Sequence, residues 1–363
     1  MSSPVRAVWY TRCPSPTASS VAIAWGFLRE AMEDSGVEAH SLRAATQRTE
    51  RQAHFTQDHE ALFRQGGIVP PLWAASRGVR TRLIGLSRIR RFQGVIALPG
   101  SGIELPADLR GRRLGLPLRT SEPVDFWRAQ SWRGLLKALE IAGIDEADVA
   151  WVNLPTEAPY HVSKPEAAQA SLWTAREASR LQAPEVLALL RGEVDAIYTY
   201  APAGLPLIEL LDATVVLSLP PEGGGSSGIG SLSALTVSER LLDERPYVVT
   251  RYVGALLAAA DWAASNPEAT LRVMAAEEGI AEEWAVESFG LELAGSLAPD
   301  LSPALLDALQ EEADFLAERG FLAAPVDIGR WQDGGPLQRA RAARSPRFTH
   351  HLSYDPITQR TLA

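Results

Sequence analysis

The sequence has a single cysteine, Cys13, among its 363 residues. This scarcity excludes an internal disulfide and any zinc or iron–sulfur site built from cysteine ligands. Long apolar runs are also missing: no stretch reaches the roughly 18 residues that a transmembrane helix needs. No basic segment followed by an apolar run precedes the first expected strand, so we expect no secretory signal peptide and a cytoplasmic protein.

Excess positive charge is absent as well. The chain has 44 Asp and Glu residues against 35 Lys and Arg residues, which gives a net charge of −9. This balance provides no electrostatic attraction for nucleic acid or for an anionic membrane surface, so we expect neither as a partner. The hydrophobic fraction of 46% is that of a folded globular protein, and the length allows two domains.

Short apolar strands alternate with helical segments along the chain, which predicts an α/β protein. Strands are expected at 5–10, 37–42, 81–89, 94–98, 149–154 and 215–219. A helix end followed by a strand is expected at 192–198, and mainly helix from residue 245 onward. An α/β unit inserted at 99–220 would give two lobes with a cleft between them. We therefore predict a first lobe of residues 1–98 plus 221–363 and a second lobe of residues 99–220.

The first expected strand leads directly to the cysteine. Residues Val5–Tyr10 are β-branched or aromatic and predict a buried strand. Ser15 is a suitable N-cap and Pro16 a suitable first residue for the helix that follows. One apolar stripe of this helix consists of Val21, Trp25, Leu28 and Met32. Cys13 is thus expected where open α/β sheets bind ligands, beside a helix N-terminus that favours a thiolate or a bound oxyanion.

A second segment contributes a histidine, an arginine and a pair of glycines. Thr56, two residues after His54, can cap a short helix. That helix is expected to run through Arg64 and to end at Gly66-Gly67.

The layout of the chain resembles the type II periplasmic-binding-protein fold, in particular the nitrate, sulfonate and taurine binding proteins. The segments that carry the resemblance are ADLRGRRLG at 107–115, GEVDAIYTY at 192–200 and the helical stretch at 245–270. The resemblance implies two lobes with an interlobe cleft, and it implies no particular chemistry.

The N-terminal third resembles the 2-(2′-hydroxyphenyl)benzenesulfinate desulfinase family, the aromatic sulfinate desulfinases of microbial dibenzothiophene desulfurisation. The matching segments are CPSPTAS at 13–19, WGFL at 25–28, HFTQD at 54–58, FRQGGIVPPL at 63–72 and RTRLIGL at 80–86. The resemblance implies that Cys13, His54 and Arg64 are catalytic and that the backbone N–H of Gly67 helps to hold the sulfinate. Much of 119–190 departs from the family pattern, so the organic part of the substrate is not implied.

The three side chains suit sulfinate chemistry. A sulfinate is a compact anion with two oxygens, which matches the planar guanidinium of Arg64. Cys13 can serve as the acid that protonates the ring carbon or as a thiolate that attacks sulfur, and His54 would set its protonation and orientation. Attack by a thiolate on an anion is electrostatically opposed, which favours the proton donor, but both routes stay open. Neither route needs a metal or an organic cofactor.

We therefore expect a monomeric hydrolase that cleaves the carbon–sulfur bond of an aryl sulfinate and releases sulfite. The alternative is a binding protein for a sulfonate, nitrate or a similar anion, which would need the arginine but not the thiol. A third use of the same fold, synthesis of a pyrimidine precursor of thiamin, has no matching pattern in this chain. Each residue taken alone also has a structural interpretation: a small buried apolar Cys13, a capping His54 and an Arg64 that favours a helix dipole.

Overall fold

The computed structural model describes residues 6–13, 15–45, 47–158, 160, 181–219, 231–343, 354–355 and 360–361. The chain forms two compact units. Unit 1 consists of Met1–Ile89, Leu232–Glu277 and Leu291–Ala363, and unit 2 consists of Arg90–Ser231 and Glu278–Gly290. The lobe boundaries predicted at 98/99 and 220/221 stay a prediction, and the strand Gln93–Ala97, which that prediction assigns to the first lobe, pairs within the sheet of unit 2.

The sheet of unit 1 has five strands in the order β2-β1-β3-β10-β4. Its strands are β1 (Ala7–Arg12), β2 (Glu38–Ser41), β3 (Leu62–Gly67), β4 (Thr81–Arg88) and β10 (Leu232–Ser238). Strand β1 is parallel to β2 and β3, whereas β10 is antiparallel to β3 and β4. The sheet is therefore mixed, and β3 is its central strand.

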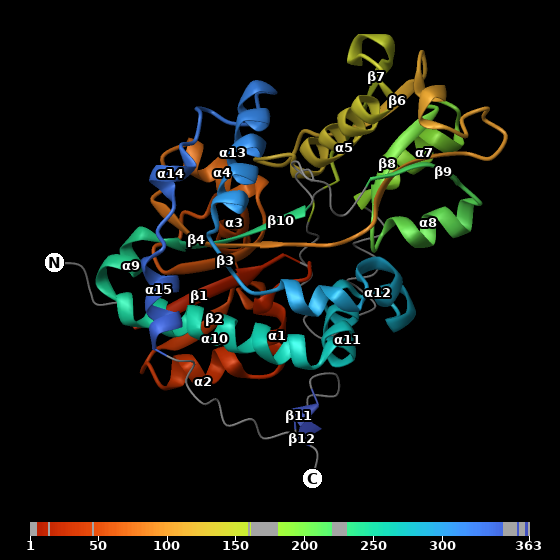
Figure 1. Ribbon diagram of the computed structural model, residues 1–363. Helices are drawn as coiled ribbons and strands as arrows, with labels where there is room; N and C mark the ends of the chain where they lie inside the picture. The colour runs from red at the N-terminus through yellow and green to blue at the C-terminus, as the bar shows by residue number, and fades with distance from the viewer. Residues whose placement is uncertain are drawn as a thin grey trace. The chain divides into compact units, whose positions relative to one another are not determined.

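Helices cover both faces of this sheet (Figure 1). Those early in the chain are α1 (Ala18–Ala24), α2 (Phe27–Glu33), α3 (Arg48–Thr56) and α4 (Val69–Ser76). Those after β10 are α9 (Glu239–Glu244), α10 (Pro246–Ser265), α11 (Pro267–Glu278), α13 (Pro303–Glu318), α14 (Ile328–Trp331) and α15 (Gly335–Ala342). Figure 1 shows α1, α2 and α10 on one face and α3 and α4 on the other. The long helix α10 contacts both α1 and α2, so it closes the core on their side.

Residues Leu62–Gly67 form strand β3, so the prediction of a helix running through Arg64 was wrong. The strand lies between β1 and β10, and five of its six residues are buried. A strand buried on both faces loses the alternation of apolar and polar residues that identifies a strand in a sequence. The pattern LFRQGG therefore gave no strand signal, and its glycine pair was misread as a helix end.

The helix expected after Cys13 also differs from the prediction. It begins at Ala18, and its N-cap is Thr17, whose side chain accepts a hydrogen bond from the backbone N–H of Ser20. The expected continuous apolar stripe is split between α1 and α2. Gly26 lies between them with a φ of 79°, a left-handed conformation that glycine adopts readily and that ends a helix.

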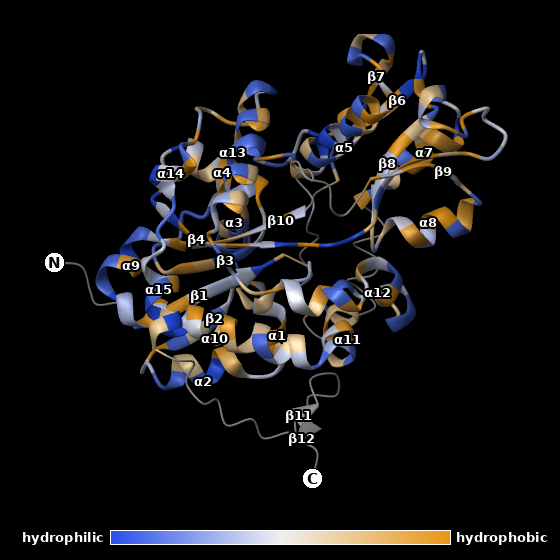
Figure 2. Ribbon diagram, in the orientation of Figure 1, coloured by the Kyte–Doolittle hydropathy of each residue, from blue (hydrophilic) through white to orange (hydrophobic). Residues whose placement is uncertain are grey.

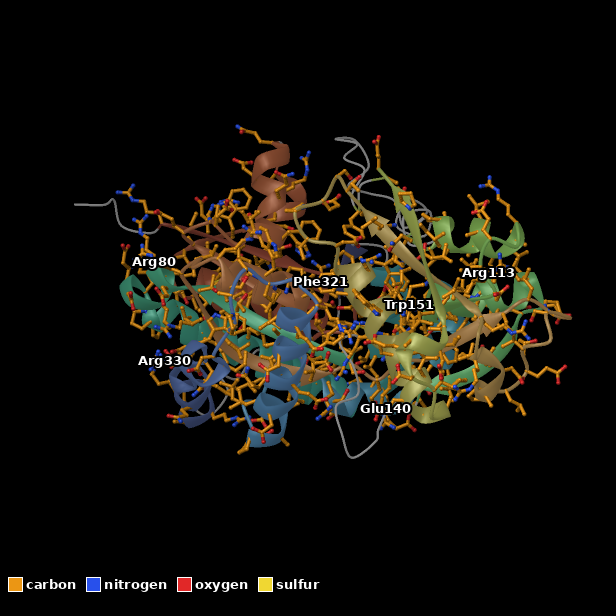
Figure 3. The ribbon with its side chains drawn as sticks, turned by 90° about the horizontal axis from the view of Figure 1, so that it is seen from above. Arg80, Arg113, Glu140, Trp151, Phe321 and Arg330 are labelled. Carbon is orange, nitrogen blue, oxygen red and sulfur yellow. The ribbon has the colours of Figure 1, made fainter. Side chains whose placement is uncertain are left out.

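Unit 2 has its own five-stranded sheet, in the order β7-β6-β8-β5-β9. Its strands are β5 (Gln93–Ala97), β6 (Arg113–Arg119), β7 (Ala150–Thr156), β8 (Ala196–Tyr200) and β9 (Thr214–Leu219). Its helices are α5 (Phe126–Ala142), α7 (Ala183–Leu190), α8 (Gly204–Leu211) and α12 (Glu282–Phe289). In Figure 3 the labels Arg113, Glu140 and Trp151 mark β6, α5 and β7. The two short strands β11 (Tyr354–Asp355) and β12 (Arg360–Thr361) pair with each other near the end of the chain.

The sheet of unit 2 has one hydrophobic core on each face. Val95 packs in the cluster that contains Trp127 and Leu135 of α5, whereas its neighbour Ile96 packs in the cluster that contains Leu189 of α7. Adjacent residues of a strand point to opposite faces, so this division follows from the pleat. Figure 2 shows the resulting hydrophobic colouring of α7 and β8.

The part of the chain that the structure describes contains no helix long and apolar enough to cross a membrane. In the same residues, no group of three or more His, Cys, Asp or Glu side chains is placed to hold a metal ion.

One buried carboxyl group makes the stability of unit 2 depend on pH. Burial raises the pKa of Glu185 to about 7, although a hydrogen bond from Trp127 Nε1 opposes the shift. The native protein therefore holds a proton that the unfolded chain releases between about pH 4.5 and pH 7. The contribution of Glu185 to the free energy of unfolding is fully present below this window, and it is lost across the window as pH rises.

We expect Glu185→Gln to remove this dependence, since the amide stays neutral and can still accept from Trp127. Across the window, the wild-type free energy of unfolding should fall relative to that of the variant by about 3 kcal/mol. Urea denaturation of both proteins at several pH values measures this difference, and parallel curves would contradict the account.

Candidate functional site

The pairing of β1 with β3 brings the predicted site residues together. The two strands are parallel, with Thr11 opposite Arg64 and Arg12 opposite Gln65. Cys13 follows β1 directly, and its backbone N–H donates to the carbonyl of Gln65 at 3.0 Å. The cysteine is thus held at the carboxyl end of β1, as predicted, and beside the strand that carries Arg64.

Cys13, His54 and Arg64 contact one another. The sulfur of Cys13 lies 3.4 Å from His54 Nε2 and 3.5 Å from Arg64 Nη2. Arg64 Nε also donates to the backbone carbonyl of His54 at 3.0 Å, which fixes the guanidinium against the last turn of α3. His54 and Arg64 are buried and Cys13 is half-buried, so the thiol is the most accessible of the three groups.

The charge of Arg64 is the main electrostatic feature of the site. Its side chain is fully buried, and burial lowers its pKa while the neighbouring Cys13 sulfur opposes the shift. Among the described residues, none forms a carboxylate ion pair with Arg64, and its Nη1 has no hydrogen-bond partner. A buried cation with a free donor is costly unless an anion pairs with it. The free donor next to the thiol therefore suits an anionic ligand.

Thr11 is a site residue that the sequence reasoning missed. Its hydroxyl oxygen lies 2.8 Å from His54 Nδ1, the ring nitrogen that does not face the cysteine, and the contact is buried. Thr11 lies two residues before Cys13, the spacing at which side chains of an extended chain point to the same side, and this spacing was the available signal.

Gly66 is a second missed residue. It has a φ of 154°, and a Cβ atom built there would lie 2.3 Å from the sulfur of Cys13. Glycine is needed at this position because any side chain would occupy the space of the thiol. Gly67, the predicted anion-binding glycine, ends β3 and is half-buried, with no atom within 4 Å of an added Cβ.

Two further contacts brace the segment around the thiol. Arg12 pairs with Glu277 at 2.5 Å, so its charge is neutralised rather than offered to a ligand. Gln65 Oε1 accepts from the backbone N–H of Ser19 at 2.9 Å, which ties the first turn of α1 to β3. The positions of Cys13 and Arg64 are therefore set by strand pairing and by buried side-chain contacts.

Fold and site together define the class of the protein. A thiol, an imidazole and an unpaired guanidinium meet at one sheet of a two-unit α/β chain of the periplasmic-binding-protein type. The periplasmic aliphatic sulphonate binding protein SsuA from Escherichia coli has the same fold, with a TM-score of 0.62 at 14% identity over 91% of this chain and 92% of that one. This likeness confirms the predicted fold class.

The relatives at higher identity show the family. A 2′-hydroxybiphenyl-2-sulfinate desulfinase of Rhodococcus erythropolis is 30% identical in an alignment 346 residues long, which covers 89% of this chain and 90% of the relative. The crystal structure of the desulfurization enzyme DszB has a TM-score of 0.74 at 28% identity, over 93% of this chain and 99% of that one. The chain belongs to the 2′-hydroxybiphenyl-2-sulfinate desulfinase family, as the N-terminal motifs indicated.

A further solved structure is a cysteine-to-serine mutant of DszB in complex with biphenyl-2-sulfinic acid, with a TM-score of 0.73 at 26% identity over 93% of this chain and 99% of that one. No protein-family model matches the sequence.

The close approach at Gly66 gives a structural test of the site. We expect Gly66→Ala to lower the free energy of unfolding by about 2 kcal/mol or more, because the new methyl group displaces the thiol and strains the backbone. Gly67→Ala is the matched control and should cost less than about 1 kcal/mol, since the space around it is empty. Chemical denaturation measures both losses of unfolding free energy. Equal losses in the two variants would show that the position of the thiol does not depend on a glycine at residue 66.

Proposed function

We propose that this protein is a desulfinase that hydrolyses the carbon–sulfur bond of an aryl sulfinate and releases sulfite, with a 2′-hydroxybiphenyl-2-sulfinate-like molecule as substrate. The observation that carries the proposal is the fully buried Arg64, whose free Nη1 donor lies on the same guanidinium that contacts the Cys13 sulfur. An anion with two oxygens on sulfur that binds this guanidinium would have its sulfur beside the thiol, because Nη2 contacts Cys13. Support comes from the relatives named as desulfinases and from the DszB complex with biphenyl-2-sulfinic acid.

In the proposed reaction Cys13 is the proton donor. Its thiol proton moves to the ring carbon that carries sulfur, the carbon–sulfur bond breaks, and the products are the arene, sulfur dioxide and a Cys13 thiolate. Water then adds to sulfur dioxide to give hydrogen sulfite, and the proton released restores the thiol. The sum is one sulfinate plus one water giving one arene plus one hydrogen sulfite.

The surroundings of the thiol favour this route over attack at sulfur. The thiolate left after protonation of the carbon lies within 3.5 Å of His54 Nε2 and of Arg64 Nη2, which can both stabilise it. Attack by the same thiolate on a sulfinate would bring two anions together next to a single guanidinium. His54 thus assists Cys13 as the thiol loses and regains its proton.

The remaining assignments belong to the same proposal. The backbone N–H of Gly67 would donate to a sulfinate oxygen, and no metal or organic cofactor takes part. The monomeric state and the cytoplasmic location expected from the sequence stay predictions. A binding protein for sulfonate or nitrate would need the arginine, but it would have no use for a thiol in contact with a histidine.

We expect Cys13→Ser to abolish sulfite release, since an alcohol is a much weaker acid than a thiol. Sulfinate affinity should change by less than about tenfold, or 1.4 kcal/mol, because Arg64 is untouched. Sulfite release and calorimetric binding, measured on both proteins, test the two expectations. Turnover that survives the substitution would remove Cys13 from the mechanism.

We expect Arg64→Lys to weaken sulfinate binding by about tenfold to a hundredfold, because an ammonium group lacks the planar fork of the guanidinium. Arg12→Lys is the matched control: it also replaces an arginine beside Cys13, but one that pairs with Glu277. The control should retain the wild-type dissociation constant. An unaltered constant for Arg64→Lys would contradict the role of Arg64 as the anion-binding group.

A further inference from the structure

Three side chains on adjacent strands connect the sheet of unit 1 to helix α3. Thr11 of β1 and Thr236 of β10 both lie opposite Arg64 of β3, so the three residues form a row on one face of the sheet. Arg64 contacts the backbone carbonyl of His54, Thr11 contacts its ring, and Thr236 donates to the side chain of Gln57 at 2.7 Å. The two threonines thus contact α3 in different ways: one contact is to the reactive imidazole and the other is to the residue that caps the helix.

We propose that Thr11 is the positioning residue of His54: its hydroxyl holds the ring so that Nε2 faces the Cys13 sulfur while the proton moves between them. In unprotonated His54 with hydrogen on Nδ1, Thr11 accepts that hydrogen and the Nε2 lone pair faces the thiol. When the proton released by hydration of sulfur dioxide returns through Nε2, an N–H bond forms there and then breaks as the S–H bond re-forms, and the Nδ1–H donor faces Thr11 throughout. The same buried hydrogen bond therefore serves both states, with no reorganisation and no other reactant.

A hydroxyl suits this role better than a carboxylate. A carboxylate at Nδ1 would strongly favour the imidazolium form, whereas a hydroxyl can accept from Nδ1–H or donate to a bare Nδ1. It fixes the direction of the ring in both protonation states, and it stabilises the imidazolium moderately, because a hydrogen bond to a charged group is the stronger one. Cys13 and Arg64 are among the groups that contact His54, and Phe55 packs edge-on against the His54 ring, with the two ring centroids 4.9 Å apart.

The test uses the single cysteine of the chain, whose alkylation by iodoacetamide reports the thiolate as a function of pH. In Thr11→Val, which keeps the volume and removes the hydroxyl, the half-maximal rate should move to higher pH and the rate at pH 7 should fall about tenfold. This is the effect of losing one hydrogen bond to a charged group. Thr11→Ser, which restores the hydroxyl, should return the rate to within about twofold of wild type.

Thr236→Val is the matched control, because it removes a threonine hydroxyl from the same row and a hydrogen bond to the same helix, α3. It should lower the melting temperature about as much as Thr11→Val and leave the alkylation profile unchanged. A profile of Thr11→Val that superimposes on wild type would overturn the proposal, and so would an equal shift in Thr236→Val. Should Thr11→Val fail to fold, Thr11→Ala carries the same expectations.

The consequence for turnover rests on the proposed function, but the alkylation measurement does not, since no sulfinate is present. Wild-type protein that releases no sulfite while its alkylation still depends on the Thr11 hydroxyl would overturn the proposed function alone. Sulfite release with an alkylation profile indifferent to Thr11 would overturn the positioning role alone.

Discussion

The burial of one guanidinium without a carboxylate partner is the constraint on which the site depends. Arg64 lies on the central strand of unit 1, has no exposed surface, and has a free terminal donor. An arrangement of this kind costs stability in the absence of a ligand, because a desolvated charge is only partly compensated by neutral acceptors. The sulfur of Cys13 is the one titratable group that interacts with it among the described residues. In the proposed function, binding of the anion and stabilisation of the thiolate both depend on this buried charge.

Strand pairing places the other residues of the candidate site around Arg64. The parallel register of β1 and β3 puts Thr11 beside Arg64 and carries the chain directly into Cys13, while α3 lies over the same face and presents His54. Gly66 leaves the space in which the sulfur sits. Each of these positions is set by the backbone ladder or by a buried contact, so the three side chains are held in place in the absence of a ligand, which is the preorganisation that the proposed catalysis would use.

The sequence was sufficient for the α/β class, for most of the strands and for the choice of three residues that the structure brings into contact. The order of the motifs pointed to Cys13, His54 and Arg64, because a family pattern can be recognised from the sequence without a structure. It could not show that Arg64 lies on a strand, since β3 is buried on both faces and has no alternating pattern. Thr11 and Gly66 were missed for a related reason. A threonine near a strand end and a glycine pair are common, and their roles exist only once Thr11 meets His54 and Gly66 meets the sulfur.

Cleavage with protonation of the carbon is the central claim, and turnover of 2′-hydroxybiphenyl-2-sulfinate in heavy water tests it most directly. The account predicts equal amounts of sulfite and 2-hydroxybiphenyl, with one deuterium on the ring carbon that lost sulfur. A sulfinate recovered unchanged after prolonged incubation with folded protein, although it binds, would contradict the account and leave a binding protein that shares the fold.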